Sequence, residues 1–521
     1  MLNHEWSLEV STQQDSKNNS RRDFLKHSGL ASGAALGAAL ALPSAAQAAP
    51  SCVLPAKWDS SVDVLVVGSG FAGLAAALEA RVAGAEVTVI DKMSVFGGNS
   101  IINGGDFAAA GTPMQKEAGI NDSPELMLKD MMKAGGYISH PQLAKMVADN
   151  SWDNLKWCMD FVGAKFTKVN FHGGHAVKRA HQTHNQSGSG LVNPMLAKCR
   201  EIGVKLENRT KLVRLITDTT GRIVGAEVKK GYRFPDEKTG STVFIQARRA
   251  VVMSSGGFSQ DVPLRSIQDP RLDARFTSTN HPGATGEALL AACQAGAMDV
   301  QMDWIQLGPW TSPDEKGFGF VPQFTERVVG YGLMVDPATG KRFFKETGNR
   351  KERADAIIML DHPAVILADS PTTLQQVHPA QMNGALENGA LKKYDTLEDL
   401  ARAYNMPVEV FVEQVKRWNG FVEKKQDTDL GCMIFPDAKP QITAPFYATR
   451  LWPRVHHTMG GLLINTKAQA IGFDLQPMKG LYACGEVTGG VHGAVRLGSV
   501  AMSDCVNFGR VAGRNAAADK A

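Results

Sequence analysis

The sequence contains few cysteines, few aromatic residues and no motif that attaches haem. Of its 521 residues only seven are cysteine and 7% are aromatic, and neither a C-x-x-C pair nor a C-x-x-C-H motif occurs. We therefore predict no disulfide framework and no covalently attached haem. No group of histidines and cysteines has the spacing of a metal site, so none is expected. The net charge of +4 gives no indication of nucleic-acid binding.

The first 48 residues have the features of an export signal. Residues 20–26, SRRDFLK, contain the twin arginines Arg21 and Arg22, and an alanine- and glycine-rich run follows that ends at Ala48. This run is too weakly apolar for a membrane anchor, which needs about 20 apolar residues. We predict a twin-arginine signal peptide over residues 1–48, use of the twin-arginine export machinery, and a periplasmic location.

Residues 63–91 predict a nucleotide-binding unit. The run DVLVVGSGFAGLAAALEARVAGAEVTVID has the order strand, glycine-rich turn, helix, strand, with Gly68, Gly70 and Gly73 in the turn and Asp91 at the end. Such glycines let the backbone approach a pyrophosphate at the helix N-terminus, and the acidic residue binds a ribose hydroxyl. The alternative is an ordinary strand-to-helix turn, which requires neither the three glycines nor the second strand that ends at Asp91.

The rest of the chain predicts an inserted domain. Strands that run into glycines, in residues 247–261 and 479–490, favour the same nucleotide unit, whereas residues 303–455 contain tryptophans, prolines and clustered charges. A chain of this length is too long for one simple domain, and a cleft between two domains suits a ligand. We predict a nucleotide domain made of residues 57–302 and 456–521, with residues 303–455 inserted.

A second glycine-rich loop predicts which dinucleotide is bound. GGNSIINGGDFAAAG, in residues 97–111, follows the strand that ends at Asp91. A nicotinamide enzyme has little use for this loop, whereas an enzyme that binds the longer FAD needs backbone amides along the rest of its cofactor. FAD is therefore the predicted cofactor.

From about residue 62 to the C-terminus the chain resembles the soluble fumarate reductase and flavocytochrome c group of the fumarate reductase/succinate dehydrogenase flavoproteins. The resemblance rests on GSGFAGLAAALEA, GGNS, SSGGFSQD, GKRFFKETGNRKERA, RVHHTMGG, GLYACGEVTGGVHGAVRLG and SVAMSDCVNFGR, which are specific in combination. It implies an α/β fold in which a Rossmann-like FAD-binding domain is interrupted by an inserted α+β capping domain. The substrate is then expected between the flavin and the cap.

The resemblance also implies catalytic residues. Reduction of a C=C bond beside a carboxylate needs a hydride, a proton, and positive charge near the carboxylate. Arg496 and His456 are expected to hold the carboxylate, Arg350 to donate the proton, and Glu326 with Thr325 to return it. From spacing alone, Arg350 would more often be a solvated surface residue. For Arg496 the alternative role is an ion pair that anchors the last helix.

The adjacent histidines of RVHHTMGG predict a site with two faces. Neighbouring side chains of an extended segment point in opposite directions, so His456 is expected to face the substrate and His457 the flavin. A metal site would need further ligands, and none accompanies the pair. The resemblance implies that a covalent link to FAD would need a histidine near the GGNS loop, as succinate dehydrogenase flavoproteins have, and residues 94–111 contain none, so FAD is predicted to be non-covalent. The predicted FAD-binding residues are Gly70, Ala72, Gly73, Asp91, Lys92, Gly98, Asn99, Ser100, Gly104, Gly105, Gly257, His457, Gly485, Glu486, Ser499 and Val500.

Two positions depart from the fumarate-reducing members of this group. Gly308 stands where they have a histidine that binds the far carboxylate, and Val329 stands where their proton relay has an arginine. The first change favours an acrylate-, methacrylate-, aryl-acrylate- or urocanate-like substrate over fumarate. Either Arg327 replaces the missing arginine of the proton relay, or the proton follows another route. Three nearby aromatic residues are either core residues or walls of an apolar substrate pocket: Trp310, Phe318 and Phe320.

These features predict an FAD-dependent reductase of a small unsaturated carboxylate. Its electrons are expected from a separate cytochrome c-type or quinol-linked donor, because no haem is expected on this chain. Fumarate reductase proper, a 3-ketosteroid dehydrogenase-like flavoenzyme and a non-catalytic flavoprotein are the alternatives. The last two have no need of the set Arg350, His456 and Arg496. The sequence leaves open which acid is reduced, which donor is used and the oligomeric state.

Overall fold

Apolar residues form the first two strands and the helix between them. In the computed structural model, which describes residues 54–520, β1 (Ser60–Val67) and β2 (Val87–Ile90) are largely buried, as parallel strands covered by helices are. Helix α2 (Phe71–Val82) begins directly after Gly70 and buries its alanines. The predicted order of strand, turn, helix and strand is therefore confirmed. The predicted signal peptide, residues 1–48, lies outside the described residues.

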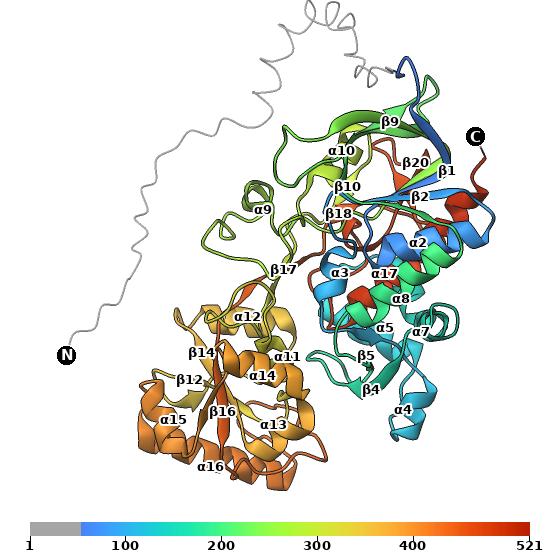
Figure 1. Cartoon of the computed structure of the whole chain (residues 1–521). Helices are drawn as coiled ribbons and strands as arrows, with labels where there is room; N and C mark the ends of the chain where they lie inside the picture. Colours follow the sequence, from blue (N-terminus) through green and yellow to red (C-terminus); the bar gives the residue numbers. More distant parts are fainter. Residues whose placement is uncertain (1–53, 521) are drawn as a thin grey trace, which may run out of the picture. The chain divides into compact units, whose positions relative to one another are not determined.

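The first strands belong to an eight-stranded sheet that joins both ends of the described chain (Figure 1). Its order is β19-β20-β9-β1-β2-β6, with β7 and β8 attached through β9. β1 pairs in parallel with β2 and β9, and β20 pairs in parallel with β9. The other strands are β6 (Lys205–Glu207), β7 (Thr210–Thr217), β8 (Ile223–Lys230), β9 (Ser241–Met253), β19 (Gln469–Ile471) and β20 (Pro477–Ala483). This is the predicted Rossmann-like arrangement.

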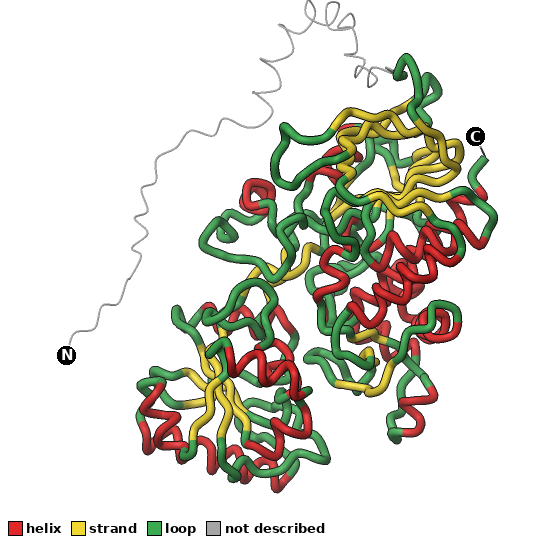
Figure 2. The backbone as a smooth tube through the Cα atoms, in the orientation of Figure 1, coloured by secondary structure: helices red, strands yellow, loops and turns green. Residues whose placement is uncertain are grey.

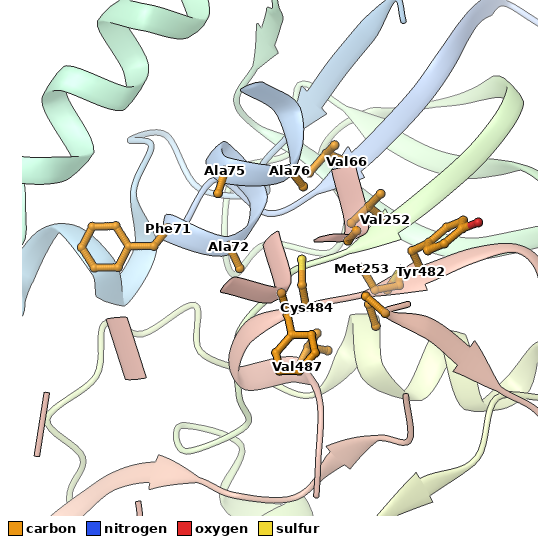
Figure 3. Close-up of a cluster of buried hydrophobic side chains, with 14 of the residues drawn as sticks. Val66, Phe71, Ala72, Ala75, Ala76, Val252, Met253, Tyr482, Cys484 and Val487 are labelled. Atoms are coloured by element: carbon orange, nitrogen blue, oxygen red, sulfur yellow. The ribbon is translucent and has the colours of Figure 1, made fainter. Parts of the chain in front are cut away.

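The last helix, α17 (Val500–Ala518), packs closely on α2. A Cβ atom at Gly509 would lie 2.5 Å from the carbonyl oxygen of Ala72, and one at Gly513 would lie 2.2 Å from that of Ala76. Figure 3 shows the buried cluster that α2 shares with β9, while Phe71, at the start of α2, points away from it. α2 is therefore held against α17 by tight backbone packing.

A second, antiparallel sheet lies in the inserted part of the chain (Figure 2). Its five strands have the order β13-β12-β14-β16-β15. They are β12 (Leu333–Asp336), β13 (Lys341–Arg342), β14 (Ala364–Ala368), β15 (Lys392–Tyr394) and β16 (Phe446–Leu451), and the helices that accompany them are α13 (Ser370–Gln376), α14 (Pro379–Glu387), α15 (Leu397–Ala403) and α16 (Val408–Lys424). This part has hydrophobic clusters of its own. The α/β fold class is confirmed, while the limits at residues 303 and 455 stay predictions.

The two connections between the sheets run side by side. Strands β11 (Ile305–Gly308) and β17 (Arg454–Thr458) pair in antiparallel fashion, with Gln306 opposite His457. Helices α11 (Val321–Arg327) and α12 (Arg350–Ile358) follow β11 in the chain. The candidate catalytic residues Thr325, Glu326 and Arg350 therefore lie on α11 and α12, the helices that follow β11 in the chain.

The remaining elements include a small sheet of three strands, in the order β3-β5-β4. Within the described residues, none of the helices combines the length and the apolar character needed to cross a bilayer. The remaining bounds are α3 (Gly98–Ile102), β3 (Asp106–Ala108), α4 (Pro113–Glu117), α5 (Pro124–Ala134), α6 (Pro141–Asp149), α7 (Ser151–Asp160), β4 (Phe166–Asn170), β5 (Ala180–Thr183), α8 (Ser189–Glu201), α9 (Val262–Gln268), α10 (Glu287–Gln294), β10 (Asp299–Val300), β18 (Gly461–Leu462) and η2 (Gly485–Val487).

Candidate active site

A cavity of about 890 Å³, partly open to solvent, lies beside the N-terminus of α2. Gly68 has a φ of +106°, and a Cβ atom there would lie 2.4 Å from the carbonyl oxygen of Ser254, so only glycine suits this turn. Gly70, the N-cap of α2, has no side chain to cap the helix, and Ser100 Oγ accepts a hydrogen bond from Phe71 N–H at 3.0 Å. A helix N-terminus with a glycine cap on a cavity wall suits a pyrophosphate, so these residues fit the predicted FAD.

Acidic and basic side chains line the same cavity. The Asp91 carboxylate accepts hydrogen bonds from the backbone amides of Ser69 (3.1 Å) and Met93 (2.9 Å), which hold it where a ribose is expected. Lys92 pairs with Glu287 at 2.6 Å. Glu287 and His281 also line the cavity but were not predicted, because no glycine motif marks their segment.

The predicted FAD-binding residues fall into three groups. Eight line this cavity: Gly70, Ala72, Asp91, Lys92, Gly98, Asn99, Ser100 and Glu486. Three line an adjoining cavity: Gly104, His457 and Ser499. Five line neither cavity: Gly73, Gly105, Gly257, Gly485 and Val500. A Cβ atom at Gly73 would lie 2.0 Å from the carbonyl oxygen of Gly68, so this glycine serves the packing of helix on strand. The binding roles themselves stay predictions.

The adjoining cavity encloses about 940 Å³ of space and shares wall residues with the first. Four of the five predicted catalytic residues line it: Glu326, Arg350, His456 and Arg496. Thr325 is not on its wall; the Thr325 hydroxyl donates a hydrogen bond to the carbonyl oxygen of Trp310 at 2.8 Å. Thr325 thus supports the backbone of a wall residue, and a role in proton transfer stays a prediction.

The two histidines of β17 have different surroundings. His456 Nδ1 lies 2.7 Å from the Thr279 hydroxyl, and its ring lies 4.8 Å from that of Trp310. His457 Nδ1 lies 3.3 Å from the Glu486 carboxylate, and its buried Nε2 has no hydrogen-bond partner in the described part of the chain. Burial and the Arg496 charge hold the pKa of both rings well below the ordinary value, so both are neutral. Among residues 54–520 no cluster of three metal-ligating side chains is found.

Arg496 is a buried cation without a carboxylate partner in the described residues. Only 4% of its surface is exposed, its Nη1 donates to the carbonyl oxygen of Leu497 at 3.2 Å, and its Nε has no partner. Burial, reinforced by Arg350, holds the pKa of Arg496 well below its ordinary range. An unpaired buried charge is costly, so an anion is expected to bind here. The alternative role, an ion-pair anchor for the last helix, has no partner to support it among these residues.

Arg350 is buried rather than solvated, so the surface alternative is wrong. Only 5% of its surface is exposed, and its guanidinium carbon lies 4.0 Å from the ring centroid of Trp310. Its Nη2 lies 3.7 Å from Glu326 Oε2. Burial lowers the pKa of Arg350 to about 10, which brings this guanidinium closer to the range of a useful acid.

Glu326 is the centre of a buried charged network. Its Oε1 accepts a hydrogen bond from Arg353 Nη2 at 2.6 Å, and its Oε2 lies 3.0 Å from His172 Nδ1. Burial alone would raise the pKa of Glu326, but Arg353, His172 and Arg350 hold it well below the ordinary value. Arg327 does not replace the missing relay arginine at Glu326, because its Nη2 donates to Asp106 at 2.6 Å instead.

Sequence reasoning missed His172 and Arg353. Arg353 lies three residues after Arg350 in α12, so its position on the same helix face was a usable signal. It also shares a small cavity with Val329, the position of the missing arginine. His172 comes from a distant segment after β4, and no local pattern indicates its contact with Glu326.

The aromatic residues near Gly308 differ in their roles. Trp310 and Phe318 line the adjoining cavity. A Cβ atom at Gly308 would lie 3.1 Å from Cζ2 of Trp310, so a side chain at 308 would press on the indole. Phe320 does not line the cavity; it is 43% exposed and packs on Gly384.

Comparisons with known proteins agree with this geometry. The FAD binding domain family model matches residues 63–502. The acrylate reductase flavoprotein subunit of Shewanella woodyi is 40% identical over 503 residues, which are 95% of this chain and 97% of that protein. A fumarate reductase (cytochrome) of Shewanella frigidimarina is 36% identical over 88% of this chain and 77% of its own length. The open conformation of a flavocytochrome c3 fumarate reductase superposes with a TM-score of 0.69 at 31% identity, covering 98% of this chain and 83% of that chain.

Proposed function

This chain belongs to the FAD binding domain family and is an FAD-dependent oxidoreductase, and on that premise we propose that it reduces the C=C bond of an α,β-unsaturated monocarboxylate. The observation that carries the proposal is Arg496, a buried cation that faces a cavity and has no carboxylate partner in the described residues. The family resemblance predicted from the sequence is confirmed by these relatives.

Arg496 and His456 are proposed to hold the substrate carboxylate. The planar guanidinium of arginine matches a carboxylate with two parallel hydrogen bonds, and its charge stabilises the electron density that develops there. His456 is neutral, so it donates from Nε2 only in the tautomer whose Nδ1 accepts a hydrogen bond from a neighbour. The Thr279 hydroxyl, 2.7 Å from Nδ1, is that neighbour and selects the ring tautomer.

Arg350 is proposed to donate the proton to the substrate carbon. Bound FAD, once reduced, supplies the hydride. Arg350 lies on the cavity wall with a lowered pKa, and Glu326 beside it keeps a negative charge that stabilises the guanidinium after reprotonation. The side chains of Arg350, Glu326 and Arg496 are buried, and the low dielectric around them strengthens the interactions of their charges.

The substrate is proposed to have one carboxylate, next to the C=C bond that is reduced. Acrylate-, methacrylate-, aryl-acrylate- and urocanate-like acids meet this requirement. Gly308 provides no side chain for a far carboxylate, and the Trp310 indole fills the space beside it. The 40% identical relative is named for acrylate and the 36% identical relative for fumarate. The apolar wall at Trp310 and Phe318 supports the first over the second.

Three further features belong to the same proposal. FAD is held non-covalently, so acid precipitation of the protein is expected to leave all the flavin in the supernatant; flavin in the pellet would contradict this.

The chain is exported to the periplasm by the twin-arginine route, so replacing Arg21 and Arg22 by lysine is expected to retain it in the cytoplasm; unchanged export would contradict this. A separate cytochrome c-type or quinol-linked protein supplies electrons.

The test is reoxidation of the reduced, FAD-loaded protein by a panel of acids without oxygen. Acrylate, methacrylate, cinnamate and urocanate are each added, and the flavin absorbance is followed. At least one monocarboxylate is expected to restore the oxidised spectrum rapidly, with a saturated acid as product. A panel in which no unsaturated acid reoxidises the flavin would contradict the proposed function.

A further inference from the structure

His172 contacts Arg350, the proposed proton donor. It lies two residues after β4, is 6% exposed, and lines the cavity proposed for the substrate. Its Nδ1 lies 3.5 Å from Nη2 of Arg350 and 3.0 Å from Oε2 of Glu326. The imidazole is therefore within reach of both the proposed acid and its carboxylate partner.

The second ring nitrogen of His172 faces another buried carboxylate. Nε2 lies 3.4 Å from Asp106 Oδ2, and Arg327 donates to the same oxygen at 2.6 Å. Asn170 donates to Asp106 Oδ1 at 3.3 Å. Arg327 and Asn170 thus hold Asp106, and Asp106 holds the ring with Nδ1 toward Glu326 and Arg350.

The backbone around His172 is packed tightly against the segment that carries Arg350. A Cβ atom at Gly173 would lie 2.4 Å from the carbonyl oxygen of Gly348, two residues before Arg350. A Cβ atom at Gly498 would lie 2.4 Å from His172 Cβ. The close approach of His172 to Arg350 is therefore built into the backbone, beyond any choice of side-chain rotamer.

Arg350 needs a proton source after each turnover, and its neighbours differ in their ability to serve. The Glu326 carboxylate is held ionised by surrounding cations and has no proton to give. The guanidinium of Arg353 retains its protons under ordinary conditions. Histidine is the side chain that ordinarily gains and loses a proton near neutral pH. Among the described side chains that contact Arg350, His172 is the histidine.

We propose that His172 returns a proton to Arg350 after each turnover, a role that rests on the proposed function of Arg350 as the acid. When the substrate carbon takes a proton from Arg350, a neutral guanidine remains. The N–H bond at His172 Nδ1 then breaks and an N–H bond forms on Arg350, directly or through Glu326 Oε2, leaving a neutral imidazole. One proton taken up from solvent, carried by water that enters the cavity as product leaves, restores the imidazolium, so no electrons are exchanged and the proton count closes.

This role is separable from that of Arg350 by comparing one turnover with many. A single turnover uses the proton already on Arg350, whereas steady-state turnover needs it replaced. In His172→Gln, reoxidation of the prereduced flavin by acrylate is expected at close to the wild-type rate. Steady-state turnover with excess reduced viologen is expected to fall about 100-fold, the scale of general acid–base effects, and added imidazole is expected to restore part of it.

The matched control is His175→Gln, in the same loop. His175 is buried and its Nε2 lies 2.8 Å from the carbonyl oxygen of Gly498, but it does not line the cavity. The ratio of single-turnover to steady-state rate is expected to match the wild type in this control. His172→Met is the second variant if His172→Gln fails to bind FAD, and flavin absorbance reports binding in each.

Each other outcome overturns the inference. Unchanged steady-state turnover in His172→Gln would show that Arg350 regains its proton by a route without His172. An equal fall in both rates would make His172 a residue that positions Arg350 or the substrate. Failure of the proposed function has a different signature: Arg350→Met, which lacks the acid, would then keep its single-turnover rate.

Discussion

The guanidinium carbon of Arg350 lies over the ring of Trp310, 4.0 Å from its centroid, and the same indole meets the ring of His456 edge-on at 4.8 Å. One buried aromatic residue therefore touches both the proposed acid and a residue proposed to hold the carboxylate. A cation–π contact in a desolvated site is worth about 2 kcal/mol. Trp310 thus links the position of the proton donor to the length of substrate that the cavity accepts.

Replacing Trp310 by alanine is expected to lower kcat for acrylate about tenfold, because Arg350 loses a contact of about 1–2 kcal/mol. The same change opens the cavity, so kcat/KM for cinnamate is expected to rise relative to that for acrylate. Phe320→Ala, a half-exposed residue off the cavity wall, is the control. An unchanged ratio between the two acids in Trp310→Ala would show that the indole does not limit substrate length.

Placing histidine at position 308 alone is not expected to create fumarate reduction. A Cβ atom there would meet Trp310 Cζ2 at 3.1 Å and His456 Cβ at 3.4 Å, so the new side chain would press on the indole and displace it. The double variant Gly308→His with Trp310→Ala is expected to reduce fumarate better than either single variant. Steady-state assays of all three with fumarate test this, and strong activity in Gly308→His alone would contradict it.

Replacing Arg496 by lysine is expected to lower kcat/KM by about 100-fold or more, because an ammonium cannot reproduce the two parallel hydrogen bonds to a carboxylate. Most of the loss is expected in KM if Arg496 binds the ground state, and in kcat if it binds the transition state more tightly. FAD content should stay at the wild-type level. Retained kcat/KM in Arg496→Lys would remove this residue from the carboxylate site.

Replacing Thr279 by valine is expected to lower kcat/KM about tenfold, since His456 loses the hydroxyl that sets its tautomer. Thr279→Ser keeps the hydroxyl and is expected to retain most of the activity. The comparison of valine with serine separates the hydrogen bond from simple packing. Equal activity of the two variants would mean that the hydroxyl does not orient His456.

Activity is expected to fall as the pH rises through about 10, because burial lowers the pKa of Arg350 to that value and an acid must carry its proton to act. Below that pH the guanidinium is protonated, so this group causes no loss there. Lysine has a lower ordinary pKa than arginine, so Arg350→Lys is expected to move the alkaline limb to lower pH. A kcat profile up to pH 11, with flavin content checked at each point, measures the shift. A limb that stays in place would exclude Arg350 as the acid.

Local motifs predicted the fold and much of the candidate site, and long-range contacts account for what was missed. The glycine turn at Gly68 and Gly70 and the strand that ends at Asp91 are contiguous in sequence, so their geometry follows from a short segment. His172 and Asp106 meet Glu326 and Arg327 across more than 150 residues of chain, and only the tertiary fold shows this. Phe320 follows Phe318 by two residues, yet it turns outward and packs on Gly384.

The central claim, reduction of a monocarboxylate in preference to fumarate, is tested most directly by the ratio of kcat/KM values for acrylate and fumarate. The FAD-loaded wild-type protein is assayed with reduced viologen without oxygen. We predict a ratio well above one, because Gly308 offers no side chain to bind a second carboxylate and Trp310 presents an aromatic wall beside it. A ratio below one, with efficient turnover of fumarate, would contradict the account.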